Sequence, residues 1–228
     1  MLLRLLKKTL LIFLLTTTSS VLALRWLSPP TSAFMLRAQW DALVEGNEDF
    51  RLNHRWTERK EISRWAAMAI VAAEDQRFLY HWGFDFNAIS KAVRRNQHAR
   101  TMHGASTLSQ QTAKNLFLYS NRSLLRKALE AYFTLLLEIC WPKHRILEMY
   151  LNIAQFGDGI YGVETASQRY FHKSSKQLKP GEAALLAAVL PNPIKLRADK
   201  PSAYVLKRRD WILRQMRVLQ GSEYLRGI

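Results

Sequence analysis

The chain has 228 residues, 48% of them hydrophobic, which is enough for one domain with a substantial core and excludes an intrinsically disordered chain. Lys and Arg number 34 against 18 Asp and Glu, a formal net charge of +16. This balance favours an anionic partner: nucleic acid, an acidic membrane surface or a phosphate-bearing substrate. The single cysteine, Cys140, excludes an intrachain disulfide and is expected to be a small buried apolar residue.

The first element along the chain is an apolar segment that follows basic residues. Arg4, Lys7 and Lys8 precede a mostly apolar run over residues 9–27, which is about long enough to cross a bilayer as a helix. The basic residues place the N-terminus in the cytoplasm. The alternative is a cleaved signal peptide, because residues 21–23 loosely suit a cleavage site. We favour a transmembrane anchor over residues 1–27, and both interpretations export the rest of the chain.

The exported part is predicted to be mostly α-helical. Residues 28–58 read as a linker, opened by Ser28-Pro29-Pro30, and as the start of the exported region, and residues 59–228 form the main domain. Apolar residues recur at helical spacing in five segments: 62–73, 125–136, 146–153, 182–190 and 202–219. No sustained β alternation is present, and the glycine-rich piece 157–162 is expected to be a loop.

Aromatic and basic residues interleave between Phe78 and Tyr119. Trp82 and Phe86, for example, precede Lys91 and Arg94. One interpretation is a core with a solvated face. The other is a surface that dips into the membrane interface, where aromatic side chains and cations meet lipid headgroups.

Several familiar catalytic sites are excluded. The chain has no zinc-ligand spacing of Cys and His, no HExxH, no Ser-x-x-Lys and no Walker A sequence. Two carboxylates remain as candidates. Glu74 follows an apolar helix face, so it is either a catalytic base or a helix-end carboxylate in solvent. Glu130 follows Arg126 by one turn, so it is either part of a site or half of a surface ion pair.

Five ordered strings carry a family resemblance. They are 74–83 (EDQRFLYHWG), 104–111 (GASTLSQQ), 126–130 (RKALE), 143–152 (KHRILEMYLN) and 209–216 (RDWILRQM). Together they resemble the signatures of the peptidoglycan glycosyltransferases, glycosyltransferase family 51, which form the transglycosylase module of class A penicillin-binding proteins. The missing Ser-x-x-Lys and the short chain favour the monofunctional, biosynthetic form. The resemblance covers residues 60–217 and leaves 31–58 without an interpretation.

The resemblance implies a lysozyme-like helical fold with a smaller membrane-facing lobe. It implies a reaction in which lipid II is polymerised into glycan strands, with inversion at the anomeric carbon and release of undecaprenyl diphosphate, in cell wall biosynthesis. Glu74 would be the base that activates the acceptor hydroxyl. The alternative activity is a lytic peptidoglycan glycosidase on the same general fold, which would cut strands instead of making them.

The resemblance also implies a substrate-binding set. Four cations would neutralise the leaving diphosphate: Lys114, Arg122, Arg126 and Lys127. Glu130 would either orient these cations or hold a divalent metal, Mg²⁺ or Mn²⁺, that bridges the diphosphate. Gln110 and Gln111 would hydrogen-bond sugar or phosphate oxygens. Ser106 and Thr107 would either contact substrate or hold their own loop.

The expected partners follow from export and from the family. They are lipid II, nascent glycan strands, membrane lipid, and proteins of cell-wall synthesis or cell division. Export argues against nucleic acid, and no organic cofactor is expected. The expected location is the bacterial inner membrane, crossed once, with the catalytic domain facing the periplasm.

Overall fold

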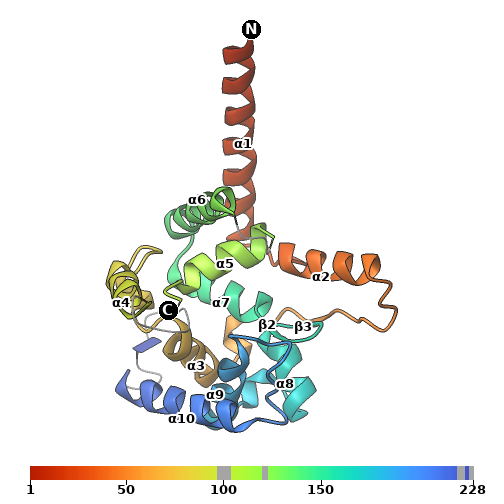
Figure 1. The fold of residues 1–228 in the computed structure, drawn as a ribbon, viewed down its shortest axis with the longest axis vertical. Helices are drawn as coiled ribbons and strands as arrows, with labels where there is room; N and C mark the ends of the chain where they lie inside the picture. The colour runs from red at the N-terminus through yellow and green to blue at the C-terminus, as the bar shows by residue number, and fades with distance from the viewer. Residues whose placement is uncertain (97–103, 120–122, 220–223, 226–228) are drawn as a thin grey trace.

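The structure is a computed structural model that describes residues 1–96, 104–119, 123–219 and 224–225. It is mostly helical, as predicted (Figure 1). The helices are α1 (Leu2–Leu24), α2 (Ala33–Val44), α3 (Arg64–Glu74), α4 (Phe86–Asn96), α5 (Leu108–Phe117), α6 (Leu124–Cys140), α7 (Lys143–Ile153), α8 (Val163–Phe171), α9 (Pro180–Val189) and α10 (Ala203–Val218). Short 3-10 turns occur at Arg59–Glu61, Phe78–Tyr80 and Ser175–Gln177. The five predicted helical segments correspond to α3, α6, α7, α9 and α10.

A small sheet joins distant parts of the chain. Strand β3 (Ile160–Tyr161) lies between β1 (Asn53–His54), to which it is parallel, and β2 (Gln155–Gly157), to which it is antiparallel. The prediction of a loop over residues 157–162 was therefore wrong, because this segment forms a hairpin. Its turn needs glycine: Gly159 has a φ of +63°, and a Cβ there would lie 2.2 Å from the carbonyl oxygen of Arg51.

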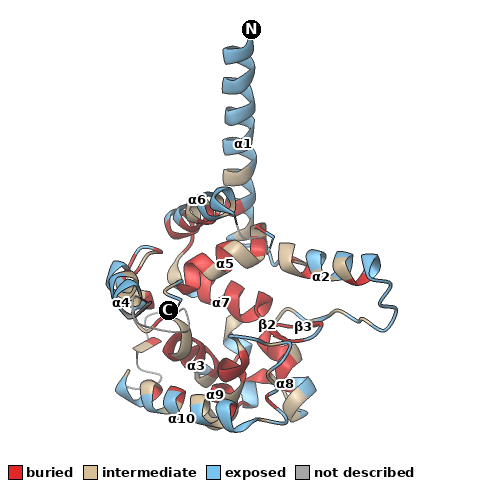
Figure 2. Cartoon of the chain, in the orientation of Figure 1, coloured by how far each residue is buried: buried red, intermediate tan, exposed pale blue. Residues whose placement is uncertain are grey.

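The core is centred on α3. Residues 66–72 of this helix are all buried, and α9 and α10 pack against it. Several of the buried residues in α3 and α9 are alanines, which let the helix axes approach closely. Figure 2 shows the buried residues concentrated in α3, α5, α7 and α9, while most of α1 is exposed. Cys140 is buried, as predicted.

Helix α1 projects from the domain (Figure 1). Among the described residues it is the one helix long and apolar enough to cross a membrane, a test that a signal sequence near the N-terminus also passes. Its last half contacts the domain: the hydroxyls of Thr17 and Tyr132 lie 2.7 Å apart, and the Trp141 indole donates to the Val21 carbonyl at 2.7 Å. Arg145 donates to the Leu24 carbonyl at 2.9 Å, so a cation caps the C-terminus of α1.

Residues 28–58, interpreted as a linker and the start of the exported region, contain regular structure that packs on the domain. Helix α2 packs on α5, and β1 joins the sheet. The segment that follows is held by α7, because the Asn152 side chain bonds both the N–H and the carbonyl of Thr57, at 2.8 and 2.9 Å. Glu148 accepts from the backbone N–H of Arg59 at 2.9 Å.

Candidate active site

Glu74 is the last residue of α3, and its carboxylate is held by two other helices. Its Oε2 accepts from the Gln111 amide at 2.9 Å, and its Oε1 pairs with Arg208 Nη2 at 3.3 Å. The other end of the Gln111 amide accepts from the Tyr150 hydroxyl at 3.0 Å. Burial, and then the nearby charge of Glu74, raise the pKa of Tyr150 well above its ordinary value, so the phenol stays protonated and donates. Both oxygens of the carboxylate are thereby oriented.

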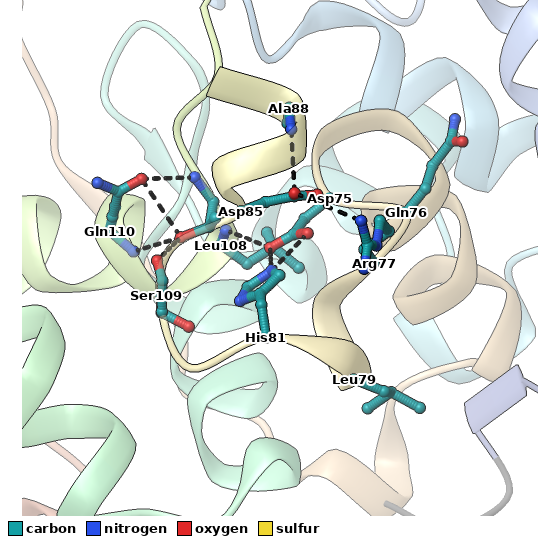
Figure 3. Close-up of polar contacts among 12 residues, drawn as sticks. Asp75, Gln76, Arg77, Leu79, His81, Asp85, Ala88, Leu108, Ser109 and Gln110 are labelled. Atoms are coloured by element: carbon teal, nitrogen blue, oxygen red, sulfur yellow. Dashed lines mark hydrogen bonds and ion pairs between the residues drawn. The ribbon is translucent and has the colours of Figure 1, made fainter. Parts of the chain in front are cut away.

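The next residue in the chain, Asp75, has a structural role. Asp75 is buried and accepts from His81 Nε2 at 2.9 Å and from the backbone N–H of Leu108 at 3.0 Å (Figure 3). It therefore fixes the end of α3, which carries Glu74, to the start of α5, which carries Gln111. His81 acts through this contact as a structural histidine.

The start of α5 is closed by a capping box. The Thr107 hydroxyl accepts from the N–H of Gln110 at 3.2 Å, and the Gln110 side chain accepts from the N–H of Thr107 at 3.0 Å. The Thr107 hydroxyl also donates to the Gly83 carbonyl at 2.6 Å. Gly83 has a φ of +77°, and a Cβ there would lie 2.6 Å from the Thr134 methyl group.

This arrangement bears on the predicted substrate-binding set. Thr107 holds its own loop, which was one of its two alternatives, and it also lines a cleft beside Glu74. Gln110 is buried and its side chain is engaged in the cap, so a substrate contact for it stays a prediction. Gln111 is directed to Glu74. Ser106 is exposed and lines the same cleft, which has a volume of about 270 Å³. The walls of this cleft also include Gln76, Arg77, Asp85, Lys91 and residues 104–105.

Two of the four predicted cations, Arg126 and Lys127, pair with Glu130 in the first turns of α6. Glu130 is buried, and its oxygens accept from Arg126 Nη1 at 2.7 Å and from Lys127 Nζ at 2.5 Å. The Nε of Arg126 is buried without a hydrogen-bond partner in the described part of the chain. The interpretation of a solvated surface pair does not fit Glu130 or Arg126, whose side chains are 4% and 14% exposed. Arg122 lies outside the described residues.

The donor set around Glu130 does not fit a metal ion held by the protein. Both of its oxygens are already engaged by cations. Within residues 1–96, 104–119, 123–219 and 224–225, no group of three or more His, Cys, Asp or Glu side chains could hold a metal. Glu130 orients two cations in this structure, and a divalent metal shared between Glu130 and a bound diphosphate stays a prediction.

Lys114 is a half-buried lysine of α5, within electrostatic reach of both carboxylates. It follows Gln111 by three residues on α5, so both share one face of the helix. Burial lowers the pKa of the Lys114 ammonium, and the charges of Glu130 and Glu74, which oppose that change, are both close enough to act on it. Its Nζ lies 5.4 Å from the centre of the Phe34 ring, and no hydrogen bond or ion pair engages it among the described residues.

Arg208 is the site residue that sequence reasoning missed. Its partner Glu74 is 134 residues away in the chain, so no local pattern joins the two. One signal was available. Val205, Ile212 and Met216 form the buried face of α10, and Arg208 falls on that face at helical spacing. An arginine on an inward face needs a partner. Arg209, which belongs to the fifth string, pairs instead with its neighbour Asp210.

The domain therefore has the features of a helical enzyme: an oriented carboxylate, Glu74, and a group of cations at Glu130. Comparison with known proteins identifies the family. The family model described as "Transglycosylase" matches residues 42–217, and the chain belongs to this family.

Named relatives agree with this result. The chain is 55% identical over 196 residues to the biosynthetic peptidoglycan transglycosylase of Cronobacter sakazakii, covering 86% of this chain and 81% of the relative. It is 51% identical over 222 residues to the protein of the same name from Pasteurella multocida, covering 97% of this chain and 90% of the relative. The family predicted from the five strings, and the prediction of a glycosyltransferase of cell wall synthesis, are confirmed.

Proposed function

We propose that this protein polymerises lipid II, moving the growing glycan from its undecaprenyl diphosphate onto the 4-hydroxyl of the next lipid II with inversion at the anomeric carbon. The observation that carries this proposal is the Glu74 carboxylate, which Gln111 and Arg208 orient at the edge of a cleft, together with the buried Arg126–Glu130 pair on α6. Lys114, on the same face of α5 as Gln111, is within electrostatic reach of both carboxylates.

Glu74 is the base in this proposal. A sugar hydroxyl is a weak nucleophile, and a carboxylate that accepts its proton during attack raises its reactivity. The bonds from Gln111 and Arg208 fix the direction of the carboxylate, and its side chain is 16% exposed, so the acceptor can reach it. Inversion requires the base on the face of the donor sugar opposite the leaving group.

The leaving group departs toward the cations. As the bond between the anomeric carbon and the phosphate oxygen breaks, its electron pair goes to the diphosphate, which gains negative charge. Lys114 and Arg126 would stabilise that charge, with Lys127 at the more exposed edge. Glu130 holds Arg126 and Lys127 in place. A lytic enzyme, which cleaves a sugar–sugar bond, would have no need for this cluster.

The cleft beside Glu74 would receive sugar. It is lined by Ser106, Gln76 and Arg77, whose hydroxyl, amide and guanidinium groups suit sugar hydroxyls and carbonyls. Ser106 is therefore kept as a substrate contact.

Helix α1 is proposed as a single-pass anchor with its N-terminus in the cytoplasm and the catalytic domain in the periplasm. Its length, its apolar composition and the basic residues Arg4, Lys7 and Lys8 support this topology. Apolar side chains beside α1 on α6, including Leu135 and Ile139, are exposed, as are Trp82 and Phe86 further from the anchor. These surfaces support a membrane-facing lobe.

The test is polymer formation from purified lipid II. The wild-type protein should produce glycan strands, and Glu74→Gln should lower turnover by on the order of 10² to 10⁴, the usual contribution of a general base. The thermal melt and lipid II binding should be retained. Glu58→Gln, at an exposed glutamate paired with Lys60, is the matched control and should behave as wild type. Near-normal turnover by folded Glu74→Gln protein, or cleavage of strands in place of synthesis, would contradict the proposal.

A further inference from the structure

Helix α2 is apolar on two opposite faces. One face packs on the domain through the buried Met35 and Ala42. The other carries Leu36, Trp40, Leu43 and Val44, which are 56%, 60%, 73% and 66% exposed. At 3.6 residues per turn these four fall within an arc of about 100° on the side away from the packed face. Within the described part of the chain nothing covers this stripe. A row of four large apolar side chains in water is a mark of an interaction surface.

The position of α2 relative to α1 indicates what covers the stripe. The apolar run over residues 9–27 would extend roughly 28 Å as a helix, close to the thickness of a bilayer core of about 30 Å. Thr17 contacts Tyr132 of α6 and Val21 contacts Trp141, so the last turns of α1 lie where the domain meets the outer leaflet. Trp26 at that end is exposed, as is typical of aromatic side chains at the lipid–water interface. Helix α2 begins at Ala33, soon after this point.

The fold keeps α2 at that level. Figure 1 shows α2 lying across the direction of α1, next to its C-terminal end, with α6 beside that end and α3, α9 and α10 on the opposite side from the N-terminus. The end of α1 is itself fixed to the domain by Arg145, which donates to the Leu24 and Leu27 carbonyls at 2.9 and 2.6 Å. The polar flank of the stripe is formed by Arg37, paired with Asp41 at 2.7 Å. An apolar face with a charged flank is the pattern of a helix that lies in the interface plane.

We propose that α2 is an in-plane membrane helix whose stripe of Leu36, Trp40, Leu43 and Val44 is buried in the outer leaflet, among headgroups and upper acyl chains. The proposal rests on the proposed membrane anchoring by α1. A single crossing helix restrains depth but leaves tilt free. A second contact, at an angle to the first and fixed to α5, restrains the tilt of the domain as well. The cleft beside Glu74 is then held at a constant height above the surface from which a lipid-linked substrate extends.

The experiment uses the full chain in nanodiscs that hold one copy each, made of phosphatidylethanolamine and phosphatidylglycerol. Cys140→Ala removes the one native cysteine, and a single cysteine is then introduced and labelled with an environment-sensitive fluorophore. The test position is Leu43→Cys. The matched control is Glu45→Cys, two residues on and outside the stripe, and Leu11→Cys on α1 reports the anchor. Quenching is measured with nitroxide lipids and with aqueous iodide.

The Leu43 label should be quenched by a nitroxide near the headgroup at least threefold more strongly than the Glu45 label, and should be protected from iodide. The proposal is overturned if the Leu43 and Glu45 labels are equally open to iodide while the Leu11 label is in lipid. In that case the membrane anchoring by α1 is supported and the role of α2 is not. If the Leu11 label is also open to iodide, both the anchor and this inference fail. Protection of Leu43 only in discs that hold two chains would identify the stripe as an interface between copies, and would also overturn it.

Discussion

Replacing Lys114 by methionine separates the catalytic role of this residue from a structural one. Burial lowers the pKa of the Lys114 ammonium, so the folded chain binds this proton less tightly than the unfolded chain, whose lysine titrates near 10.5. Between the two pKa values the unfolded state carries more protons, and the free energy of unfolding rises with pH. Below both, the charged lysine opposes folding. Lys114→Met should therefore leave the melting temperature unchanged or raise it.

The same change should impair turnover. A hydrogen bond from a charged donor contributes about 1.5–3 kcal/mol, which corresponds to roughly a 10- to 150-fold loss of rate if the contact forms mainly as the diphosphate leaves. Because that charge develops in the transition state, the loss should appear in kcat more than in KM. The assay is steady-state polymerisation of lipid II. Lys176→Met, at an exposed lysine paired with Glu61, is the control and should keep wild-type rates.

Two results would refute this reasoning. Wild-type turnover by Lys114→Met would show that the diphosphate binds elsewhere. If the melting temperature of Lys114→Met falls together with its activity, Lys114 supports the fold, and the free-energy cost of burying its charge is offset by stabilising contacts.

Three further changes test the supports of the site. Arg208→Gln should lower kcat about tenfold, since Glu74 loses the partner of its Oε1. Arg208→Lys should recover part of the rate. Equal rates for the wild type and both variants would exclude a positioning role for Arg208. Tyr150→Phe should cost about 1 kcal/mol of stability and lower kcat a few-fold, because the Gln111 amide is then free to turn; a variant identical to wild type in melt and rate would contradict this. Arg145→Met should destabilise the protein in detergent by about 3–5 kcal/mol, because Glu148 loses its ion-pair partner and the Leu24 carbonyl at the end of α1 loses its donor. A change below about 1 kcal/mol would argue against docking of α1.

The sequence predicted the elements whose signals are local. Helix α3 follows from a plain apolar pattern, and α9 from an alanine- and leucine-rich run that begins at a proline. Helix α5 has no plain apolar pattern in the sequence, because its buried face includes Ser109, Gln110 and Thr112, which are polar and satisfied by specific bonds. Helix α2 was not predicted. With apolar side chains on two opposite faces it has no single stripe, so the periodicity that indicates a helix is weak.

The candidate site was predictable where chemistry is confined to a short string, and not where it depends on long-range packing. Glu74 and the group of Arg126, Lys127 and Glu130 could be found from residue type and spacing. Gln110 and Gln111 were grouped together, although the Thr107-x-x-Gln110 spacing is a capping-box pattern that assigns Gln110 to the helix cap and leaves Gln111 free to face Glu74. Arg208 comes from a helix whose contact with Glu74 exists only after α10 has packed on α3.

The site combines a base that is oriented before substrate binds with a cation that acts mainly in the transition state. The carboxylate of Glu74 is already oriented in the free protein by Gln111 and Arg208, so no ordering is needed when the acceptor arrives. Lys114 is the opposite case, since its charge is disfavoured by burial until an anion is present. A diphosphate that gains charge as its bond breaks removes that penalty most fully in the transition state. The interaction between Lys114 and the diphosphate is therefore stronger in the transition state than in the bound ground state. This difference is the condition for an interaction to increase kcat.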